Sequence, residues 1–469
     1  MLRQRRIELH GRIAQTLRTA FPELVDRQPE VYAAHCAAAG LLRDAVEAWQ
    51  RAARRATERS AYGEAARHYR EAVSVAAQLP GGPARDELEL SLQVALGAQM
   101  IAARGNAAPE VEAAYRRAEA LCARVDNANH RFRALRGLLT FFMVRGRPTE
   151  AQRIGGQLLD LAEQSGDTGV RLQVHRPLGL NFFYLGRFEE AQVQLDRALA
   201  LHDPIAHADH RHEYGSDPAV LALCNRGWIR WFVGDAGGAL ADCEAAVTLA
   251  RALEHPHSQA FALSFLASVR QGRREPVEAL AACAELHDLA RLHTFPYWAT
   301  WEQVLAGWAR AQIGDTRAGV RAIAAGLDAY RATGAELMVP YFAALFGEAL
   351  LLDGDRNGAR QVLDDGIIIA RQHDIAFYAP ELVRLRARAV DQGARCDAVQ
   401  FAAEAAAWSQ RLGARTLELR ALVDLASLAL PNDQTDAQAA LFRLRATFSD
   451  QVILPDLADA DRWLTAAKA

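Results

Sequence analysis

Four segments of the chain repeat one spacing of small residues, and this spacing constrains the fold more than any other feature. In each segment one glycine stands seven residues before a second: Gly179/Gly186, Gly227/Gly234, Gly307/Gly314 and Gly347/Gly354. A small residue follows five positions after the second glycine, and another seven positions later: Ala191/Ala198, Ala239/Ala246, Gly319/Gly326 and Ala359/Gly366.

This spacing has a direct physical interpretation. A glycine inside a helix lets a second helix approach closely, and small residues seven apart lie on one face of the helix that receives it. The second glycine of each pair suits a helix end, because glycine adopts the left-handed conformation at little cost. Each segment is therefore predicted to form two antiparallel helices joined by a short turn.

The turn glycines recur at 146, 186, 234, 272, 314, 354 and 393, in steps of 40, 48, 38, 42, 40 and 39 residues. This period predicts an all-α, right-handed superhelical array of about nine to eleven hairpins. Its stability is expected to be nearly nearest-neighbour, because each hairpin buries its apolar face only against adjacent hairpins. The longest step contains "LHDPIAHADHRHEYGSDP" (201–218), which we interpret as an inserted loop at about 202–218.

The near absence of lysine excludes several kinds of chemistry. Lys468 is the only lysine, so a G-x-x-x-x-G-K-[ST] phosphate-binding loop and Schiff-base catalysis have no side chain to use. Arginine clusters at 3–6, 54–59 and 145–148 suggest a nucleic-acid site, but they are interleaved with acids in a chain of net charge −3. They are better explained as solvated helix faces. We expect no cofactor, no nucleic-acid partner and no membrane partner.

The cysteines and apolar runs indicate the compartment. Six cysteines are scattered without a C-x-x-C pair, as expected for small buried side chains in a reducing environment. The first 21 residues lack the continuous apolar core of a signal peptide, and the longest apolar run, 138–144, is too short to span a bilayer. We expect a cytoplasmic protein.

The repeat resembles the tetratricopeptide repeat in its longer-period bacterial form. Stretches such as "AAPEVEAAYRRAEALC" (107–122) and "ATFSDQVILPDLADADRWL" (446–464) resemble the C-terminal repeat region of large bacterial signalling ATPases, some of which carry a class III nucleotide cyclase or a DNA-binding domain. The resemblance implies three regions. Residues 1–60 form N-terminal helices that resemble the junction after an ATPase module, residues 61–415 form the repeat array, and residues 416–469 form capping helices. It carries no catalytic function to any residue here.

The histidine-rich segment has two interpretations. His207, His210 and His212, with Asp203 or Asp209, have the residue types and spacing of a metal site. However, Pro204 and Pro218 bracket a polar segment without a rigid scaffold to fix ligand geometry. We favour a structural or partner-contacting loop and predict no metal site.

Residues on the first helix of each hairpin are candidates for a concave groove. Aromatic and arginine side chains suit peptide binding because they offer contact area and charge-assisted hydrogen bonds. An alternative is that Trp298, Trp301, Leu305 and Trp308 form a core stripe at helical spacing, and for the tryptophans we favour this packing role. The groove candidates are Arg133, Arg136, Arg176, Trp228, Trp231, Trp301, Trp308 and Glu348.

These observations favour a non-enzymatic interaction or regulatory module of a bacterial signalling system. Its groove is expected to bind a protein segment or effector, with a separate ATPase or cyclase chain among the possible partners. The alternative is a separated C-terminal part of an ATPase, adenylate cyclase or transcriptional regulator whose catalytic or DNA-binding domain lies on another chain.

Overall fold

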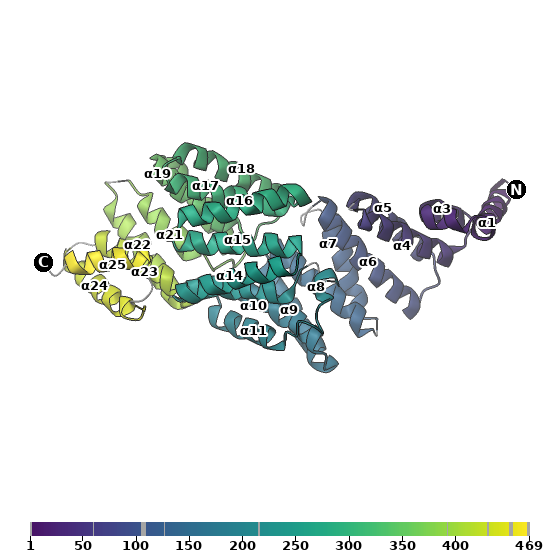
Figure 1. The fold of residues 1–469 in the computed structure, drawn as a ribbon, viewed down its shortest axis with the longest axis horizontal. Coiled ribbons are helices and arrows are strands. Elements are labelled where there is room, and N and C mark those ends of the chain that lie inside the picture. The colour runs from purple at the N-terminus through teal and green to yellow at the C-terminus, as the bar shows by residue number, and fades with distance from the viewer. Residues whose placement is uncertain are drawn as a thin grey trace. The chain divides into compact units, whose positions relative to one another are not determined.

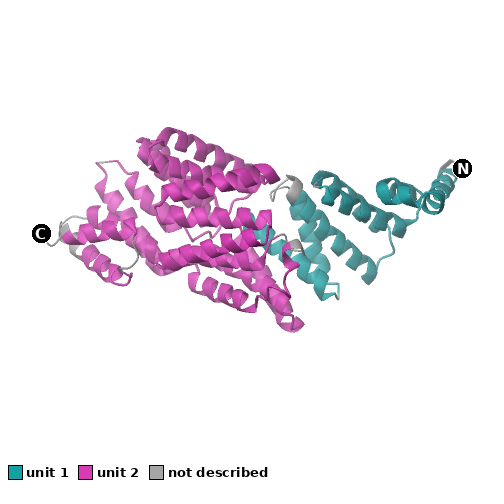
Figure 2. Cartoon of the chain, viewed as in Figure 1, with its two compact units in different colours: residues 1–145 teal, residues 146–469 magenta. Residues whose placement is uncertain are grey.

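The computed structural model describes residues 2–59, 61–104, 109–125, 127–213, 216–391, 393–428, 431–449 and 454–466. Within these ranges the regular structure consists of twenty-five helices and contains no strand, in agreement with the predicted all-α class (Figure 1). The chain divides into two compact units, Met1–Arg145 and Gly146–Ala469 (Figure 2). This division differs from the boundaries implied at 60/61 and 415/416, which rest on resemblance and stay a prediction.

Unit 1 consists of eight helices that pack mainly against their neighbours in the sequence. Tyr115 fills a tight space between two of them, because Cβ atoms added to Gly97 and Gly137 would lie within 3 Å of its ring. Burial raises the pKa of Tyr115 to about 12. The helices are α1 (Leu2–Ala20), α2 (Pro22–Arg27), α3 (Pro29–Ala38), α4 (Leu42–Glu58), α5 (Tyr62–Ala76), α6 (Pro83–Arg104), α7 (Pro109–Cys122) and α8 (Ala128–Val144).

Unit 2 is a series of hairpins, and in Figure 1 helices α14 to α17 lie side by side in order. We call the leading helix of each hairpin its first helix. The first helices are α10 (Thr168–Tyr184), α13 (Pro218–Phe232), α15 (Pro256–Gly272), α17 (Pro296–Gln312), α19 (Val339–Asp353), α21 (Ala379–Arg388) and α23 (Arg415–Leu428). The others are α9 (Pro148–Ser165), α11 (Phe188–Leu201), α12 (His210–Glu213), α14 (Ala236–Ala252), α16 (Pro276–His293), α18 (Thr316–Ala332), α20 (Arg356–Gln372), α22 (Arg395–Leu412), α24 (Pro431–Arg445) and α25 (Pro455–Ala466).

The first glycine of each pair has the predicted role of allowing close helix approach. A Cβ added to Gly227 in α13 would lie 2.8 Å from the carbonyl oxygen of Ala239 in α14. A Cβ added to Gly307 in α17 would lie 2.9 Å from the carbonyl oxygen of Gly319 in α18. Because such distances are shorter than van der Waals contact, any larger residue would push the two helices of the hairpin apart.

The second glycine of each pair is left-handed, as predicted, with φ of 74° at Gly186, 95° at Gly234, 102° at Gly314 and 84° at Gly354. The first two turns also contact distant parts of the chain: a Cβ on Gly186 would lie 2.9 Å from Leu412, and one on Gly234 would lie 3.0 Å from Phe448. At Gly314 and Gly354 such a Cβ would meet nothing within 4 Å. The early turns are therefore buried against later repeats.

The glycine at 272 departs from the prediction. It is the last residue of α15, and the left-handed residue of this turn is Arg274, with φ of 58°. A Cβ on Gly272 would lie 2.7 Å from the ring of Trp231. Glycine is required here by the approach of an indole ring and not by the turn.

The expectation that each hairpin buries its apolar face only against adjacent hairpins is wrong for unit 2, because early turns contact late parts of the chain. Thr416 Oγ1 donates to the carbonyl oxygen of Trp231, 185 residues away, at 2.5 Å. The N–H of Ala376 donates to the carbonyl oxygen of Tyr184 at 2.8 Å. We call these contacts, which join the ends of α10 and α13 to the loop before α21 and to the start of α23, the closure. It makes long-range packing part of the fold's stability.

Aromatic side chains fill the interior that the closure encloses. The ring centroid of Phe377 lies 4.9 Å from that of Phe183 and 5.4 Å from that of Trp228, which come from α10 and α13. Trp228 also lies 5.5 Å from Tyr341 of α19. Such pairs stabilise beyond their burial when edge-to-face or offset. The concave side of the array is therefore a core.

Candidate binding site

The predicted groove tryptophans lie on first helices, but their rings are buried. Only 2% of Trp228, 1% of Trp231, 2% of Trp301 and 1% of Trp308 is exposed. This burial favours the packing interpretation of the tryptophan stripe over direct contact of the rings with a ligand. Whether the remaining groove candidates contact a partner stays a prediction.

Two of the candidates meet at a polar end of this interior. The indole N–H of Trp308 donates to Oε2 of Glu348 at 2.8 Å, across 40 residues of sequence. Glu348 is half-buried. The same spacing of 40 residues joins Arg384 to Asp424, whose atoms Nη1 and Oδ2 lie 2.6 Å apart. Equivalent positions of successive first helices therefore contact one another here.

A network of buried ion pairs surrounds this point. Arg384 forms a bidentate pair with Glu381, at 2.7 and 2.9 Å. Arg420 Nη1 lies 3.1 Å from Glu381, and its Nη2 lies 2.8 Å from Asp456. At the rim, Arg274 Nη1 lies 2.6 Å from Asp459. The network joins α21, α23 and α25 to the turn after α15.

The network keeps its central carboxyl ionised. Burial alone raises the pKa of Glu381, but the charges and hydrogen bonds of Arg384 and Arg420 outweigh it and lower the pKa to about 2. Removing one member of such a buried network is expected to be costly, because the other charges stay buried without compensation.

A cavity of about 80 Å³ opens beside the network, and we call it the charged cavity. Its volume suits the tip of one ionic side chain better than a whole small molecule. Arg388 stands at its edge, with a side chain 54% exposed and Nε 3.9 Å from Asp424. The cavity is lined by Gln271, Arg274, Trp308, Glu348, Arg384, Arg388, Arg420, Val423, Asp424, Asp456 and Asp459.

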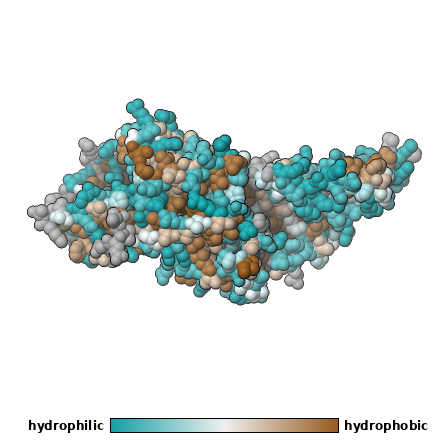
Figure 3. Space-filling model, in the orientation of Figure 1, coloured by the Kyte–Doolittle hydropathy of each residue, from teal (hydrophilic) through white to brown (hydrophobic). Residues whose placement is uncertain are grey.

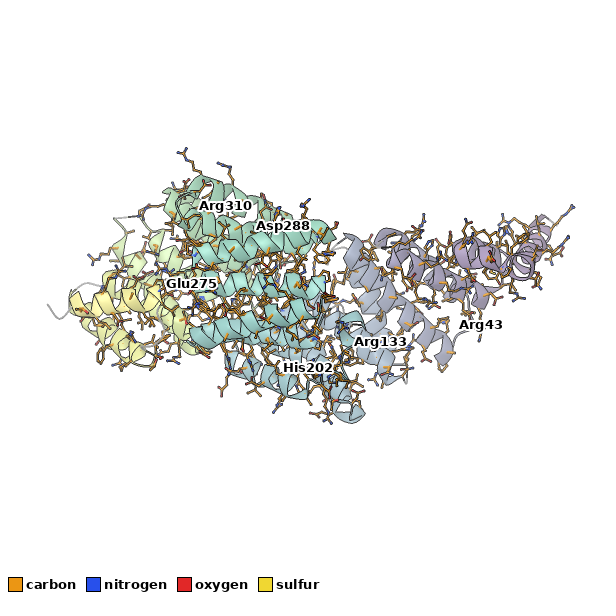
Figure 4. All side chains as sticks on the ribbon, in the orientation of Figure 1. Arg43, Arg133, His202, Glu275, Asp288 and Arg310 are labelled. Carbon is orange, nitrogen blue, oxygen red and sulfur yellow. The ribbon has the colours of Figure 1, made fainter. Side chains whose placement is uncertain are left out.

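The other groove candidates lie elsewhere. Arg133 is exposed and Arg136 half-buried on α8 of unit 1, and Figure 4 labels Arg133 there. Arg176 is half-buried on α10 of unit 2. None of these three lines the charged cavity.

The histidine-rich segment forms turns and the short helix α12, in place of a fully irregular loop. The Asp203 carboxylate accepts from the N–H groups of Ile205 and Ala206, which lower its pKa. Nδ1 of His207 accepts from the N–H of Asp203 at 3.1 Å, and the His207 and His210 rings stack 4.9 Å apart. These atoms hold the segment's own turn.

No group of three or more side chains suited to a metal ion occurs in the described part of the chain. The His212 side chain lies outside the described residues. Figure 4 labels His202, whose pKa is lowered by burial. The segment therefore gives no geometric support for the metal interpretation.

A serine and a histidine that the sequence did not single out also meet. Ser216 Oγ lies 2.7 Å from Nδ1 of His257, and the indole N–H of Trp298 donates to Nε2 of the same ring at 3.2 Å. A neutral imidazole has one N–H, so Nδ1 carries it and donates to Ser216. Burial lowers the pKa of His257 to about 4. This histidine is thus not arranged to accept a proton from the serine.

The visible surface offers little else. Hydrophobic residues on the face shown in Figure 3 occur in small groups interrupted by hydrophilic ones. Every helix in the described ranges is too short or too polar to cross a bilayer. Five of the cysteines are buried and Cys396 is exposed.

The sequence did not single out the arginines and acids of the network, apart from Glu348 beside it. Arg384 and Asp424 repeat the spacing of Trp308 and Glu348, so the period itself would have placed them together. No repeated spacing identifies Asp456 of α25, because its position beside the network depends on the closure.

The fold defines this protein as a tetratricopeptide-like α-solenoid, an array of consecutive helical hairpins. No protein-family model matches the chain. An uncharacterized protein of Rhizobium meliloti (strain 1021) is 26% identical over 411 residues, covering 85% of this chain and 39% of that protein. The chain thus spans about two fifths of the length of this relative.

Two solved structures resemble the fold at low sequence identity. A Rap protein complexed with Competence and Sporulation Factor has a TM-score of 0.56 and 13% identity, over 78% of this chain and 98% of that one. The Cut9–Hcn1 hetero-tetramer of the APC/C gives a TM-score of 0.50 and 12% identity, over 93% and 76%. At such identity these similarities concern the fold alone.

Proposed function

We propose that this protein is an interaction and regulatory module of a bacterial signalling system, without catalysis of its own. A segment of a partner protein binds at the charged cavity and places a basic side chain against Glu348. The observation that carries the proposal is the partial burial of this carboxylate without a basic partner within the described ranges. It is half-buried and accepts from the Trp308 N–H, and in the described part of the chain no basic side chain forms an ion pair with it within 4.0 Å.

The charge of Glu348 lacks an ion-pair partner of its own among the described residues. The nearby arginines Arg384 and Arg420 are engaged by Glu381, Asp424 and Asp456. A basic side chain from a partner adds the missing positive charge at a partly desolvated site, where an ion pair is stronger than at an open surface. Arg388 at the rim is free to turn toward an acidic group of the same segment, because its contact with Asp424 is long.

The solved structures of similar fold support a binding role. The Rap protein was solved in complex with Competence and Sporulation Factor, and Cut9 in a hetero-tetramer with Hcn1. A solenoid suits this role because its repeated helices present a large surface without requiring a catalytic centre.

Capture of partners from an extract of the native cells tests the proposal. The bait is the full chain, with Glu348→Gln as the test variant and Glu302→Gln as the matched control. Glu302 is a part-buried glutamate on first helix α17 that does not line the charged cavity. The proposal expects a protein recovered by the wild type and by Glu302→Gln, but at least ten-fold less by Glu348→Gln. Equal recovery with all three baits would contradict it.

A second candidate is that the chain works as one part of a larger ATPase, nucleotide cyclase or transcriptional regulator. The length of the Rhizobium meliloti relative, of which this chain covers 39%, favours it. In this case the catalytic or DNA-binding domain is encoded elsewhere and the array acts as its regulatory arm. Calorimetric titration of the chain with MgATP should show no binding, while the neighbouring reading frames should encode the missing domain. Tight MgATP binding to the chain alone would refute both candidates.

A further inference from the structure

A second, larger cavity lies where the early and late parts of unit 2 meet, and we call it the seam cavity. Its volume is about 510 Å³. One wall is formed by Thr149 and Gln152 of α9 with Leu185 and Arg187 of the turn after α10. The other is formed by Ala370, Arg371, Asp374 and Ala376 around the end of α20, and by Trp408 of α22.

The walls are held together by contacts of the closure. Thr149 Oγ1 donates to Oδ2 of Asp374 at 3.0 Å, across 225 residues of sequence. Beside it, the N–H of Ala376 donates to the carbonyl oxygen of Tyr184. A molecule in this cavity therefore contacts both ends of the closure. A ligand that binds only the closed arrangement stabilises that arrangement.

The lining combines an apolar floor with basic groups. Leu185, Ala370, Ala376 and the half-buried Trp408 supply the apolar surface. The indole N–H of Trp408 is a hydrogen-bond donor on this half-buried ring. Of the charged lining residues, Arg187 and Arg371 are positive and Asp374 is negative. The lining residues therefore carry one net positive charge, which an anionic ligand compensates when the two arginines leave their pairs with Glu190 and Glu404.

Both arginines are able to reach a ligand because their present pairs are exposed. Arg187 pairs with Glu190 at 2.8 Å, with side chains 48% and 47% exposed. Arg371 pairs with Glu404 at 2.7 Å, with side chains 57% and 38% exposed, and its guanidinium lies 5.8 Å from the centre of the Trp408 ring. Exposed pairs of this kind contribute little stability and exchange readily.

We propose that the seam cavity binds a small organic carboxylate with a flat apolar body. The body lies against Trp408 and Leu185, and the carboxylate takes hydrogen bonds from Arg187 and Arg371 in the bidentate geometry that guanidinium groups favour. The volume falls in the range of small-molecule sites. The C-terminal residue of a peptide offers the same chemistry, and the experiment separates these two sources. Occupancy strengthens the closure, so the ligand acts as an effector.

The test uses the full chain, with benzoate, phenylacetate and indole-3-acetate as probes and binding measured by ligand-observed NMR. Indole-3-acetamide removes only the charge and is expected to bind at least ten-fold more weakly than indole-3-acetate. Arg371→Gln should weaken the acid at least ten-fold. The matched control is Arg331→Gln, an exposed arginine one repeat earlier, in the last turn of α18.

A short peptide ending in tryptophan with a free carboxyl group identifies the source. Tighter binding of the peptide than of the free acids assigns the site to a peptide terminus, and the reverse assigns it to a small molecule. Bound probe should also slow amide hydrogen exchange in residues 148–187 and 370–408. If no carboxylate binds at 10 mM, or if Arg371→Gln binds as the wild type does, the proposal is wrong. Glu348→Gln should leave this binding unchanged, so the two proposed sites fail separately.

Discussion

Replacing Phe377 with alanine tests whether the closure joins distant repeats into one cooperative unit. Phe377 has no exposed surface and lies in the loop between α20 and α21. Its ring contacts Phe183, Tyr184 and Trp228, which belong to first helices near the start of unit 2. The substitution thus removes contacts between segments that are far apart in the sequence.

The expected size of the effect follows from the burial. Loss of a fully buried phenylalanine side chain destabilises by about 3–5 kcal/mol, through the lost transfer free energy and the cavity left behind. In an array with only neighbour contacts, this loss stays near the mutated repeat. Because Phe377 contacts both ends of the closure, we expect the loss to reach α10 and α13 as well as α20 and α21.

Hydrogen exchange measured by mass spectrometry locates the effect. In Phe377→Ala, amide exchange in both regions should accelerate on the order of 10²–10⁴-fold, as the lost free energy implies for exchange through local opening. Phe188→Ala is the matched control, since this ring is 2% exposed and contacts Phe183 of its own hairpin and Phe232 of the next one. The control should accelerate exchange in α10, α11 and α13 only. If Phe377→Ala leaves α10 and α13 as protected as in the wild type, the closure does not couple the repeats.

Four further substitutions test an early turn, a buried histidine and the buried ion pairs. Gly186→Ala and Gly354→Ala both place alanine in a left-handed turn, which costs about 1–2 kcal/mol of stability each. Only Gly186→Ala also adds a clash, so in denaturant unfolding this variant should be less stable than Gly354→Ala by about 1–3 kcal/mol. Equal losses in the two variants would contradict burial of the early turn. Because the folded-state pKa of His257 is lowered to about 4 from 6.5, its contribution to stability is complete above pH 6.5 and is lost as the pH falls toward 4. The loss of stability should reach about 3 kcal/mol. Urea titrations at pH 7.5 and 4.5 measure it, and His257→Asn should remove this part of the pH dependence. If the pH dependence is unchanged in His257→Asn, other groups cause it. Glu381→Gln should lower the free energy of unfolding by about 3–5 kcal/mol, because Arg384 and Arg420 stay buried with less compensating charge; a loss below 1 kcal/mol or so would show that water reaches the network.

Local spacing in the sequence determined the hairpins. Gly227 and Ala239 were predicted to meet because an interhelical contact at backbone distance excludes side chains, and this requirement leaves small residues at fixed offsets. The left-handed turns at Gly186 and Gly354 were predicted for an equally local reason, the steric cost of a Cβ at positive φ. Both effects act within one repeat, so one repeat of sequence is enough to reveal them.

Only the tertiary structure decided what the hairpins enclose. The sequence favoured a packing role for Trp228 and Trp231, but it did not indicate that Phe377 and α23, from a distant part of unit 2, bury these rings. How far an array curves depends on small rotations added over many repeats, and no single repeat encodes that sum. The repeat period accounts for the pairs Trp308–Glu348 and Arg384–Asp424 at the charged cavity. The rest of that cavity and the whole seam cavity depend on this curvature, which brings distant residues together.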